Sequence, residues 1–288
     1  MTKAPPRIAE SDLESAACPL CLSVDSKLVC YPKVLLPFAV KQCNKCGMEY
    51  LSPRLSELAM QACYRSDHYF KGEGYQDYTE QESALRATFR RLLRQLTNER
   101  SSEGRLLEIG CGHGYLLAEA APYFYYRCGT DYSASALSHA TPYAQRLVCG
   151  GLDDLPPEEK DFDCVIANHV IEHVYNPRVF VSNLLARLRS GGSLLLSTPN
   201  AGSVWRYLMG RRWPSYKLPE HIYYFDRHHL AGLMQSAGVE TVTSVPYPHA
   251  FPLSLVASKI GIRVGSKLGR YTIWLPGTTV ALAGRKPI

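Results

Sequence analysis

From Arg105 to the C-terminus, short apolar segments that favour strands alternate with segments whose apolar residues recur at helical spacing. Strands are expected at 105–109, 127–130, 146–149, 162–167, 193–197, 239–245 and 278–283, and helices at 115–123, 133–140, 177–188 and 226–236. Strands that alternate with helices indicate a parallel sheet with helices on both of its faces. We therefore expect an α/β fold with a doubly wound, mostly parallel seven-stranded sheet.

A glycine-rich turn follows the first of these strands at once. The segment reads LLEIGCGHGY, with Gly110, Gly112 and Gly114 between a buried strand and a helix. Glycine tolerates left-handed backbone angles and lets a ligand lie against the chain. Ligands of doubly wound sheets bind at the carboxyl ends of the strands. Asp131 ends the next strand, where its carboxylate can accept both hydroxyls of a ribose, the alternative being a helix cap.

The glycine turn resembles the first motif of class I S-adenosylmethionine-dependent methyltransferases of the small-molecule type. Three later segments resemble motifs of the same family: FDCVIANHVIEHV at 162–174, LRSGGSLLLSTPN at 188–200 and HIYYF at 221–225. The resemblance covers the chain from Tyr64 to the C-terminus. It implies a Rossmann-like sheet, S-adenosylmethionine as the cofactor, and methyl transfer by in-line displacement.

The resemblance also implies cofactor-binding roles for residues at the ends of the strands. They are Glu108 for the amino group, Gly110, Gly112 and Gly114 for the methionine portion, Asp131 for the ribose, Tyr132 for the adenine, and Asn168 and His169 beside the sulfonium. Many relatives place an aspartate where this chain has Gly151. The adenine contact is therefore expected from the Leu152 backbone or from Asp153.

Methyl transfer requires in-line positioning, and it requires a base where the acceptor atom carries a proton. His221 precedes a predicted helix in a loop where substrate contacts gather, and His173 follows Glu172. Each histidine is a candidate base or a structural anchor. The aromatic residues expected to contact the substrate are Tyr69, Tyr75, Tyr78, Trp213 and Tyr224, although core packing is an equal alternative for the three tyrosines that precede the sheet.

Four cysteines near the N-terminus form a CxxC…CxxC pair with 21 residues between its halves: Cys18, Cys21, Cys43 and Cys46. Two such turns can bring four thiolates into the tetrahedral cage that zinc prefers. A closed cage of this kind serves folding, so we expect structural zinc in a small ribbon-like module. The alternative is nucleic-acid recognition, but the module has few basic or stacking side chains.

We divide the 288 residues into a flexible tail at 1–14, a zinc-binding module at 15–55, a helical and aromatic cap at 56–100 and a cofactor-binding domain at 101–288. Residues 79–98 of the cap have helical periodicity. Ten cysteines without a secretion signal suggest a reducing compartment, and we expect a cytoplasmic protein. No apolar run is long enough to cross a bilayer.

The net charge of +6 is modest, and basic residues gather in two clusters, at 86–105 and at 206–217. Such clusters attract phosphate, although a solvated helix face is the simpler explanation. We expect a small-molecule acceptor, phosphorylated or not, such as a sugar, a nucleotide-sugar or a natural-product intermediate, and a monomer or homodimer. The alternatives are an RNA methyltransferase and a cofactor-binding protein without activity.

Overall fold

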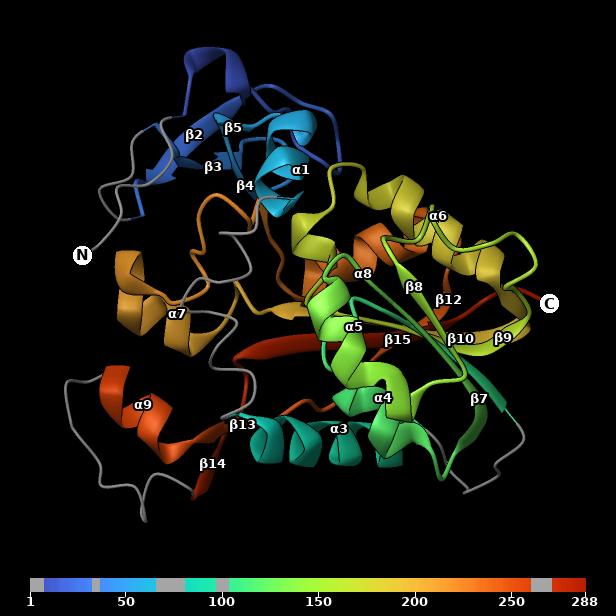
Figure 1. The fold of residues 1–288 in the computed structure, drawn as a ribbon. Coiled ribbons are helices and arrows are strands. Elements are labelled where there is room, and N and C mark those ends of the chain that lie inside the picture. Colours follow the sequence, from blue (N-terminus) through green and yellow to red (C-terminus); the bar gives the residue numbers. More distant parts are fainter. Residues whose placement is uncertain (1–7, 33–36, 66–80, 97–103, 260–270) are drawn as a thin grey trace.

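The computed structural model describes residues 8–32, 37–65, 81–96, 104–259 and 271–288 (Figure 1). Within these residues the main sheet has seven strands, in the order β12-β15-β10-β9-β6-β7-β8. Their bounds are β6 (Gly104–Ile109), β7 (Phe124–Asp131), β8 (Arg146–Cys149), β9 (Phe162–Asn168), β10 (Leu188–Pro199), β12 (Glu240–Ser244) and β15 (Thr279–Arg285). Strand β15 lies antiparallel between β10 and β12, and the other neighbours are parallel. The predicted fold class is confirmed.

Helices cover both faces of this sheet, as Figure 1 shows. On one face lie α3 (Glu82–Leu96), α4 (Tyr115–Ala120) and α5 (Ala134–Ala140). On the other face lie α6 (Pro177–Arg187) and α8 (Arg227–Ser236). The central strands β6 and β9 are buried on both sides because each face packs against helices.

Shorter elements complete the described part of the chain. They are α1 (Glu57–Arg65), α7 (Val204–Met209), α9 (Leu253–Lys259), the antiparallel pair β13 (His249–Pro252) and β14 (Thr272–Leu275), and the 3-10 turns η1 (Glu10–Asp12), η2 (Thr141–Tyr143), η3 (Ile171–His173) and η4 (Gly210–Arg212). Helix α3 is anchored on β13, where the Ala250 N–H donates to Thr88 Oγ1 at 2.9 Å.

The N-terminal segment shares a sheet with a much later part of the chain. Strands β2 (Ser26–Cys30), β3 (Val40–Cys43) and β4 (Glu49–Leu51) continue into β11 (Tyr223–Tyr224), while β1 (Leu13–Glu14) pairs with β5 (Arg54–Leu55). Tyr223 lies opposite Tyr50 in the antiparallel pair β11–β4. The apolar core is continuous from Phe38 and Met48 to Leu107 on β6. The cysteine-bearing segment is therefore packed into the larger domain.

Most predicted elements are present, with shifted ends. The predicted strand at 193–197 is longer, because β10 begins at Leu188, which pairs with Phe162 on β9. That pairing also ends α6 at Arg187. Among the described residues, no helix is both long and apolar enough to span a membrane. The proposed domain boundaries remain predictions, and parts of the tail and the cap lie outside the described residues.

Candidate active site

The glycine turn links β6 to α4 and needs its glycines. Gly110, Gly112 and Gly114 have φ angles of +73°, +52° and +75°, in the left-handed region. A Cβ atom on Gly110 would lie 2.7 Å from Val170 Cγ2, and one on Gly114 would lie 2.8 Å from Ala140 Cβ. The backbone of the turn is held by the Thr130 carbonyl, which accepts from the Gly110 and Cys111 N–H groups. The turn thus leaves no room for side chains at two of its glycines.

This geometry predicts opposite effects for two alanine substitutions. Gly110→Ala should lower the free energy of unfolding by about 2 kcal/mol, because a left-handed alanine is strained and its Cβ meets Val170. Gly232→Ala is the control, in the interior of α8, where a Cβ meets nothing within 4 Å. It should raise the free energy of unfolding by about 0.5–1 kcal/mol. Urea denaturation measures both, and wild-type stability in Gly110→Ala would contradict the described turn.

Glu108 is a buried carboxyl group beside this turn. Its side chain is on β6, the residue is only 3% exposed, and Oε2 has no hydrogen-bond partner among the described residues. Burial, with a smaller contribution from the charge of Asp131, raises the pKa of Glu108 well above its usual value. A cationic group placed at Oε2 would satisfy this oxygen and favour the ionised form.

Asp131 lies at the carboxyl end of β7, where both of its oxygens face backbone donors. Oδ2 accepts from the Gly112 N–H at 2.9 Å, and Oδ1 accepts from the Ser133 N–H at 2.8 Å. Burial raises the pKa of Asp131, and the two N–H groups oppose that rise. The helix cap is Ser133, whose Oγ accepts from the Ala136 N–H. Asp131 therefore braces the turn and keeps further acceptor capacity for a ligand.

Tyr132 explains why glycine occupies position 151. A Cβ atom on Gly151 would collide with Tyr132 Oη, so a larger residue there would displace the ring. The Gly151 N–H is bonded to Asp154 Oδ2 at 2.8 Å. Leu152 is 6% exposed, whereas Asp153 is exposed. The phenol ring of Tyr132 thus occupies the place where a side chain at 151 would extend.

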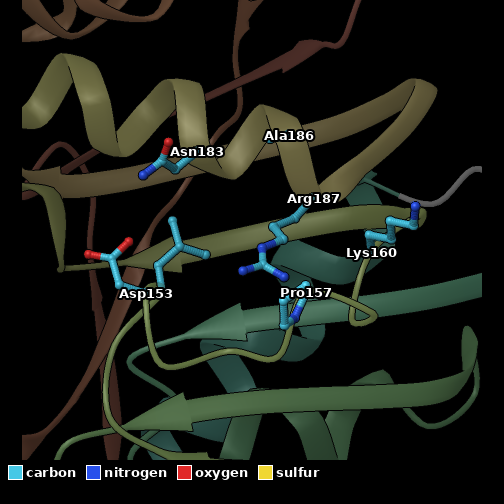
Figure 2. A pocket seen from close by; sticks show the side chains of 7 residues that line it. Asp153, Pro157, Lys160, Asn183, Ala186 and Arg187 are labelled. Carbon is cyan, nitrogen blue, oxygen red and sulfur yellow. The ribbon is translucent and has the colours of Figure 1, made fainter.

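A cleft of 370 Å³ lies next to this loop (Figure 2). It is lined by Leu152, Asp153, Pro157, Lys160, Asn183, Ala186 and Arg187. The Arg187 guanidinium donates to the carbonyls of Leu155, Pro156 and Glu159, which fixes the loop against α6. The cleft contains two of the predicted adenine residues, but Glu108 and Asp131 do not line it.

Asn168 ends strand β9 next to the end of β10, and His169 follows it. Ser197 Oγ donates to Asn168 Oδ1 at 2.8 Å, and the His169 N–H donates to the Ser197 carbonyl at 2.9 Å. Asn168 Nδ2 and His169 Nε2 are buried without a hydrogen-bond partner in the described part of the chain. His169 has a left-handed backbone, with φ of +53°, which is rare outside glycine and marks strain.

A compact group of side chains lies next to His169. It consists of Glu172, His173 and His221. One ligand-type atom from each lies within 4.8 Å of the others. Burial and the neighbouring His173 lower the pKa of His221 to about 3, and burial also lowers the pKa of His173. Burial alone would raise the pKa of Glu172, but the neighbouring imidazoles of His169, His173 and His221 lower it to about 2. The structure brings both predicted bases together around a carboxylate.

Two residues near this group were not predicted. His249, on β13, has its ring centroid 6.1 Å from that of His169, and the Tyr247 ring lies 6.5 Å from His169. Burial, with His169, lowers the pKa of His249 to about 3. The only local signal is the run YPHAF at 247–251, with one histidine between two aromatic residues. Sequence alone does not bring this run to the end of β9, because α3 and β14 hold it there.

Two of the five predicted substrate residues, Trp213 and Tyr224, lie in the described part of the chain. Tyr69, Tyr75 and Tyr78 lie outside the described residues. Trp213 and Tyr224 are 4% and 3% exposed, and their ring centroids are 6.3 Å apart. Tyr224 is on β11 opposite Glu49, so it packs where the N-terminal sheet meets the larger domain. Burial raises the pKa of Tyr224 well above its usual value.

The four predicted metal ligands Cys18, Cys21, Cys43 and Cys46 form one cluster, with all sulfur atoms within 4.8 Å of one another. The two contacts between sulfur atoms of different CxxC turns are 3.4 and 3.5 Å. A tetrahedral site with Zn–S bonds of about 2.3 Å needs sulfur atoms about 3.8 Å apart. Backbone N–H groups outweigh the effect of burial and lower the pKa of Cys43 to about 7. These residues fit a zinc ion.

Each CxxC turn is followed by a residue with a left-handed backbone, Leu22 and Gly47. The second turn is also held by the larger domain. His229 on α8 bonds through Nε2 to the Cys46 carbonyl at 2.9 Å and through Nδ1 to Asp226 at 2.8 Å. The hydrogen bond to Asp226 raises the pKa of His229.

Comparison with known proteins shows which protein family the chain belongs to. The family model described as "Methyltransferase domain" matches residues 78–244, more than half of the chain. A probable S-adenosylmethionine-dependent methyltransferase of Mycolicibacterium smegmatis is 31% identical over 161 residues, which cover 54% of this chain and 60% of that protein. A ubiquinone biosynthesis O-methyltransferase of Bradyrhizobium sp. is 32% identical over 120 residues, which cover 40% of this chain and 43% of that protein. The chain thus spans about half the length of the curated relatives it matches.

Solved structures share the fold at low sequence identity. The 1,6-didemethyltoxoflavin-N1-methyltransferase of Burkholderia thailandensis, with 1,6-didemethyltoxoflavin and S-adenosylhomocysteine bound, has a TM-score of 0.55 and 17% identity. It covers 92% of this chain and 100% of its own. A methyltransferase of Thermotoga maritima has a TM-score of 0.54 and 19% identity, and covers 76% of this chain and 98% of its own. The Rossmann-like methyltransferase fold is thereby confirmed.

Proposed function

We propose that this chain, which belongs to the methyltransferase-domain family, transfers a methyl group from S-adenosylmethionine to a small-molecule acceptor. The observation that carries the proposal is the pair of buried carboxyl groups, Glu108 and Asp131, around a left-handed glycine turn. They sit at the ends of the neighbouring parallel strands β6 and β7. A ligand with both an ammonium group and a ribose matches this pair, and S-adenosylmethionine carries both.

The proposed roles follow the cofactor from one end to the other. Glu108 holds the ammonium group, Gly110, Gly112 and Gly114 lie along the methionine portion, and Asp131 accepts from the ribose hydroxyls. Tyr132, Leu152 and Asp153 lie along the adenine, and Asn168 and His169 lie by the sulfonium. The protein's contribution to the reaction is in-line positioning of the acceptor atom, the methyl carbon and the sulfur.

Glu108→Gln is expected to stabilise the cofactor-free chain and to weaken cofactor binding. The pKa of Glu108 is raised above its ordinary value of 4.5, so above that pH the unfolded chain has lost a proton that the folded chain keeps. This carboxyl therefore lowers stability progressively as the pH rises above about 4.5. The glutamine variant should melt at a higher temperature at pH 7.5, with the difference shrinking towards pH 4. Its affinity for S-adenosylmethionine should fall about tenfold or more, because a charge-assisted hydrogen bond is lost.

Thermal melts without cofactor and calorimetric titration with cofactor check both halves of that prediction. Glu240→Gln, at an exposed position of β12, is the matched control and should change neither quantity. A glutamine variant at position 108 that binds the cofactor as tightly as the wild type would contradict the role given to Glu108.

The acceptor class is supported by relatives and by the charge pattern. The Burkholderia structure holds 1,6-didemethyltoxoflavin, and the Bradyrhizobium relative is named for ubiquinone biosynthesis. A sugar, nucleotide-sugar or natural-product intermediate remains our proposal for this chain. The buried positions of Trp213 and Tyr224 leave their substrate role as a prediction. We also propose that residues 56–100 form a helical and aromatic cap on the cofactor-binding domain.

Intramolecular ion pairs favour a small molecule over RNA. Arg86 and Arg90 both donate to Glu119 at 2.8 Å, and Arg105 is paired with Glu159 at 3.1 Å. In the second cluster, Arg206 is paired with Glu49, on the N-terminal sheet. Three arginines of the first cluster and one of the second are thus bonded within the chain, where an RNA-binding protein would direct them to phosphates.

The four-cysteine cluster is proposed to hold structural zinc. Four thiolates close the coordination sphere, so the ion would supply stability and no reactive position. It would hold the two CxxC turns in the geometry that lets His229 reach the Cys46 carbonyl. The sheet β11-β4-β3-β2 would then be fixed against the larger domain.

A turnover assay tests the proposed function. The full chain is incubated with methyl-labelled S-adenosylmethionine and separate pools of sugars, nucleotide-sugars, phenols, amines and structured RNA. We expect label in one of the small-molecule pools, together with S-adenosylhomocysteine. Label in RNA alone would overturn the acceptor class, and cofactor binding without transfer to any pool would favour the cofactor-binding protein without activity.

A further inference from the structure

The group formed by Glu172, His173 and His221 lies at the carboxyl end of the sheet, apart from the four cysteines. Glu172 and His173 are in η3, directly after β9, and His221 lies just before β11. A carboxylate oxygen and one ring nitrogen from each histidine are within 4.8 Å of one another. Three side chains from two distant segments therefore converge on one point.

Backbone carbonyls orient both imidazole rings. His173 Nδ1 is 3.0 Å from the Glu220 carbonyl, and His221 Nδ1 is 2.9 Å from the Ser215 carbonyl. A carbonyl oxygen only accepts hydrogen bonds, so each Nδ1 carries the proton. In the neutral rings the lone pair is then on Nε2. Histidines that bind metal ions through one nitrogen are oriented in this way by a hydrogen bond from the other nitrogen.

The carboxylate of Glu172 is wholly buried and is only partly satisfied. Thr198 Oγ1 donates to Oε2 at 3.0 Å. Oε1 has no hydrogen-bond partner among the described residues, and His169 Nδ1 lies 3.4 Å from it. A buried charge without full compensation is costly, and a bound cation compensates it. The unpaired Oε1 atom is thus a second observation, independent of the convergence of the three side chains, that indicates a bound cation.

We propose that Glu172, His173 and His221 bind a divalent transition-metal ion. Imidazole and carboxylate ligands suit zinc, cobalt, manganese or ferrous iron, whereas four thiolates select zinc. The two sites of this chain therefore differ in their metal preference. The proposal gives His173 and His221 the role of ligands in place of the predicted role of bases.

Three protein ligands leave coordination positions open, as in metal sites that bind a substrate or water. The group adjoins Asn168 and His169, which are proposed to lie by the sulfonium. If the proposed methyl transfer is correct, the ion can bind an oxygen of the acceptor and lower the pKa of an acceptor hydroxyl. The metal site thus deepens the proposed function and favours an oxygen-bearing acceptor.

Titration of the zinc-loaded full chain with Co²⁺, followed by optical absorption and by metal analysis, tests the site. We expect one Co²⁺ per chain in addition to zinc, with weak visible bands and without the intense near-ultraviolet bands of cobalt thiolates. Glu172→Gln and His221→Gln should each weaken Co²⁺ binding about 100-fold. His139→Gln, an exposed histidine that stacks on His113, is the control and should bind Co²⁺ like the wild type.

The wild type alone can overturn the proposal, even where a variant fails to fold. Uptake of no ion beyond zinc, or uptake only with thiolate bands, would contradict it. Uptake that persists in both folded variants would also contradict it. S-adenosylmethionine titrations of the same samples keep the two proposals apart, because a failed metal site with intact cofactor binding leaves the proposed function standing.

Discussion

Asp131→Asn is expected to lower the affinity for S-adenosylmethionine by about 100-fold, which corresponds to about 2.7 kcal/mol. The carboxylate already accepts from the Gly112 and Ser133 N–H groups, and its remaining acceptor capacity faces the proposed ribose site. Asparagine replaces one oxygen with an amide donor. The variant therefore loses a charge-assisted bond to the ribose. It also places its side-chain amide donor against one of the two backbone N–H donors. Calorimetric titration with the cofactor measures the loss.

The matched control for this variant is Asp161→Asn. Asp161 is exposed, and asparagine accepts its left-handed backbone, with φ of +61°. The control should bind the cofactor with wild-type affinity. A folded Asp131→Asn protein that binds S-adenosylmethionine with undiminished affinity would contradict the proposal that Asp131 binds the ribose.

Cys43→Ala is expected to remove one zinc ion per chain and to lower the thermal midpoint by about 10 °C or more. Structural zinc sites supply much of the stability of the segments that they hold. A loss of about 3–5 kcal/mol shifts the midpoint by roughly 2–4 °C per kcal/mol in a domain of this size. The effect should reach the whole chain, because β4 is paired with β11 and the apolar core is continuous between the two parts. Metal analysis and calorimetric melting measure the two changes.

Cys149→Ala serves as the cysteine control. Cys149 is exposed on β8 and takes no part in the cluster. It should leave the zinc content and the midpoint unchanged. A wild-type chain purified without zinc, or a Cys43→Ala variant with full zinc content, would contradict the structural role of the cluster.

The cofactor end of the site could be predicted because its signals are local in the sequence. Gly110 directly follows β6, and Asp131 is the last residue of β7, so both motifs can be read next to apolar strands. Parallel strands then bring their carboxyl ends to one edge of the sheet. The four cysteines were predictable for the same reason, since each CxxC pair is one local turn.

The acceptor end depends on contacts between distant segments. Tyr224 pairs with Glu49 through β11, and no local pattern links these two residues. Glu172 stands in the predicted motif, yet its burial against Thr198 requires the end of β10, which lies 26 residues later. His249 reaches His169 through a hairpin that was not predicted. Tertiary packing, which propensity and spacing do not encode, decides these positions.

The central claim is that the turn at Gly110–Gly114, with Glu108 and Asp131, binds S-adenosylmethionine. Isothermal titration of the unmodified full chain with S-adenosylmethionine and with S-adenosylhomocysteine tests it most directly. We predict saturable binding of one molecule per chain for both ligands, with competition between them. A folded, zinc-loaded chain that binds neither ligand would contradict the account.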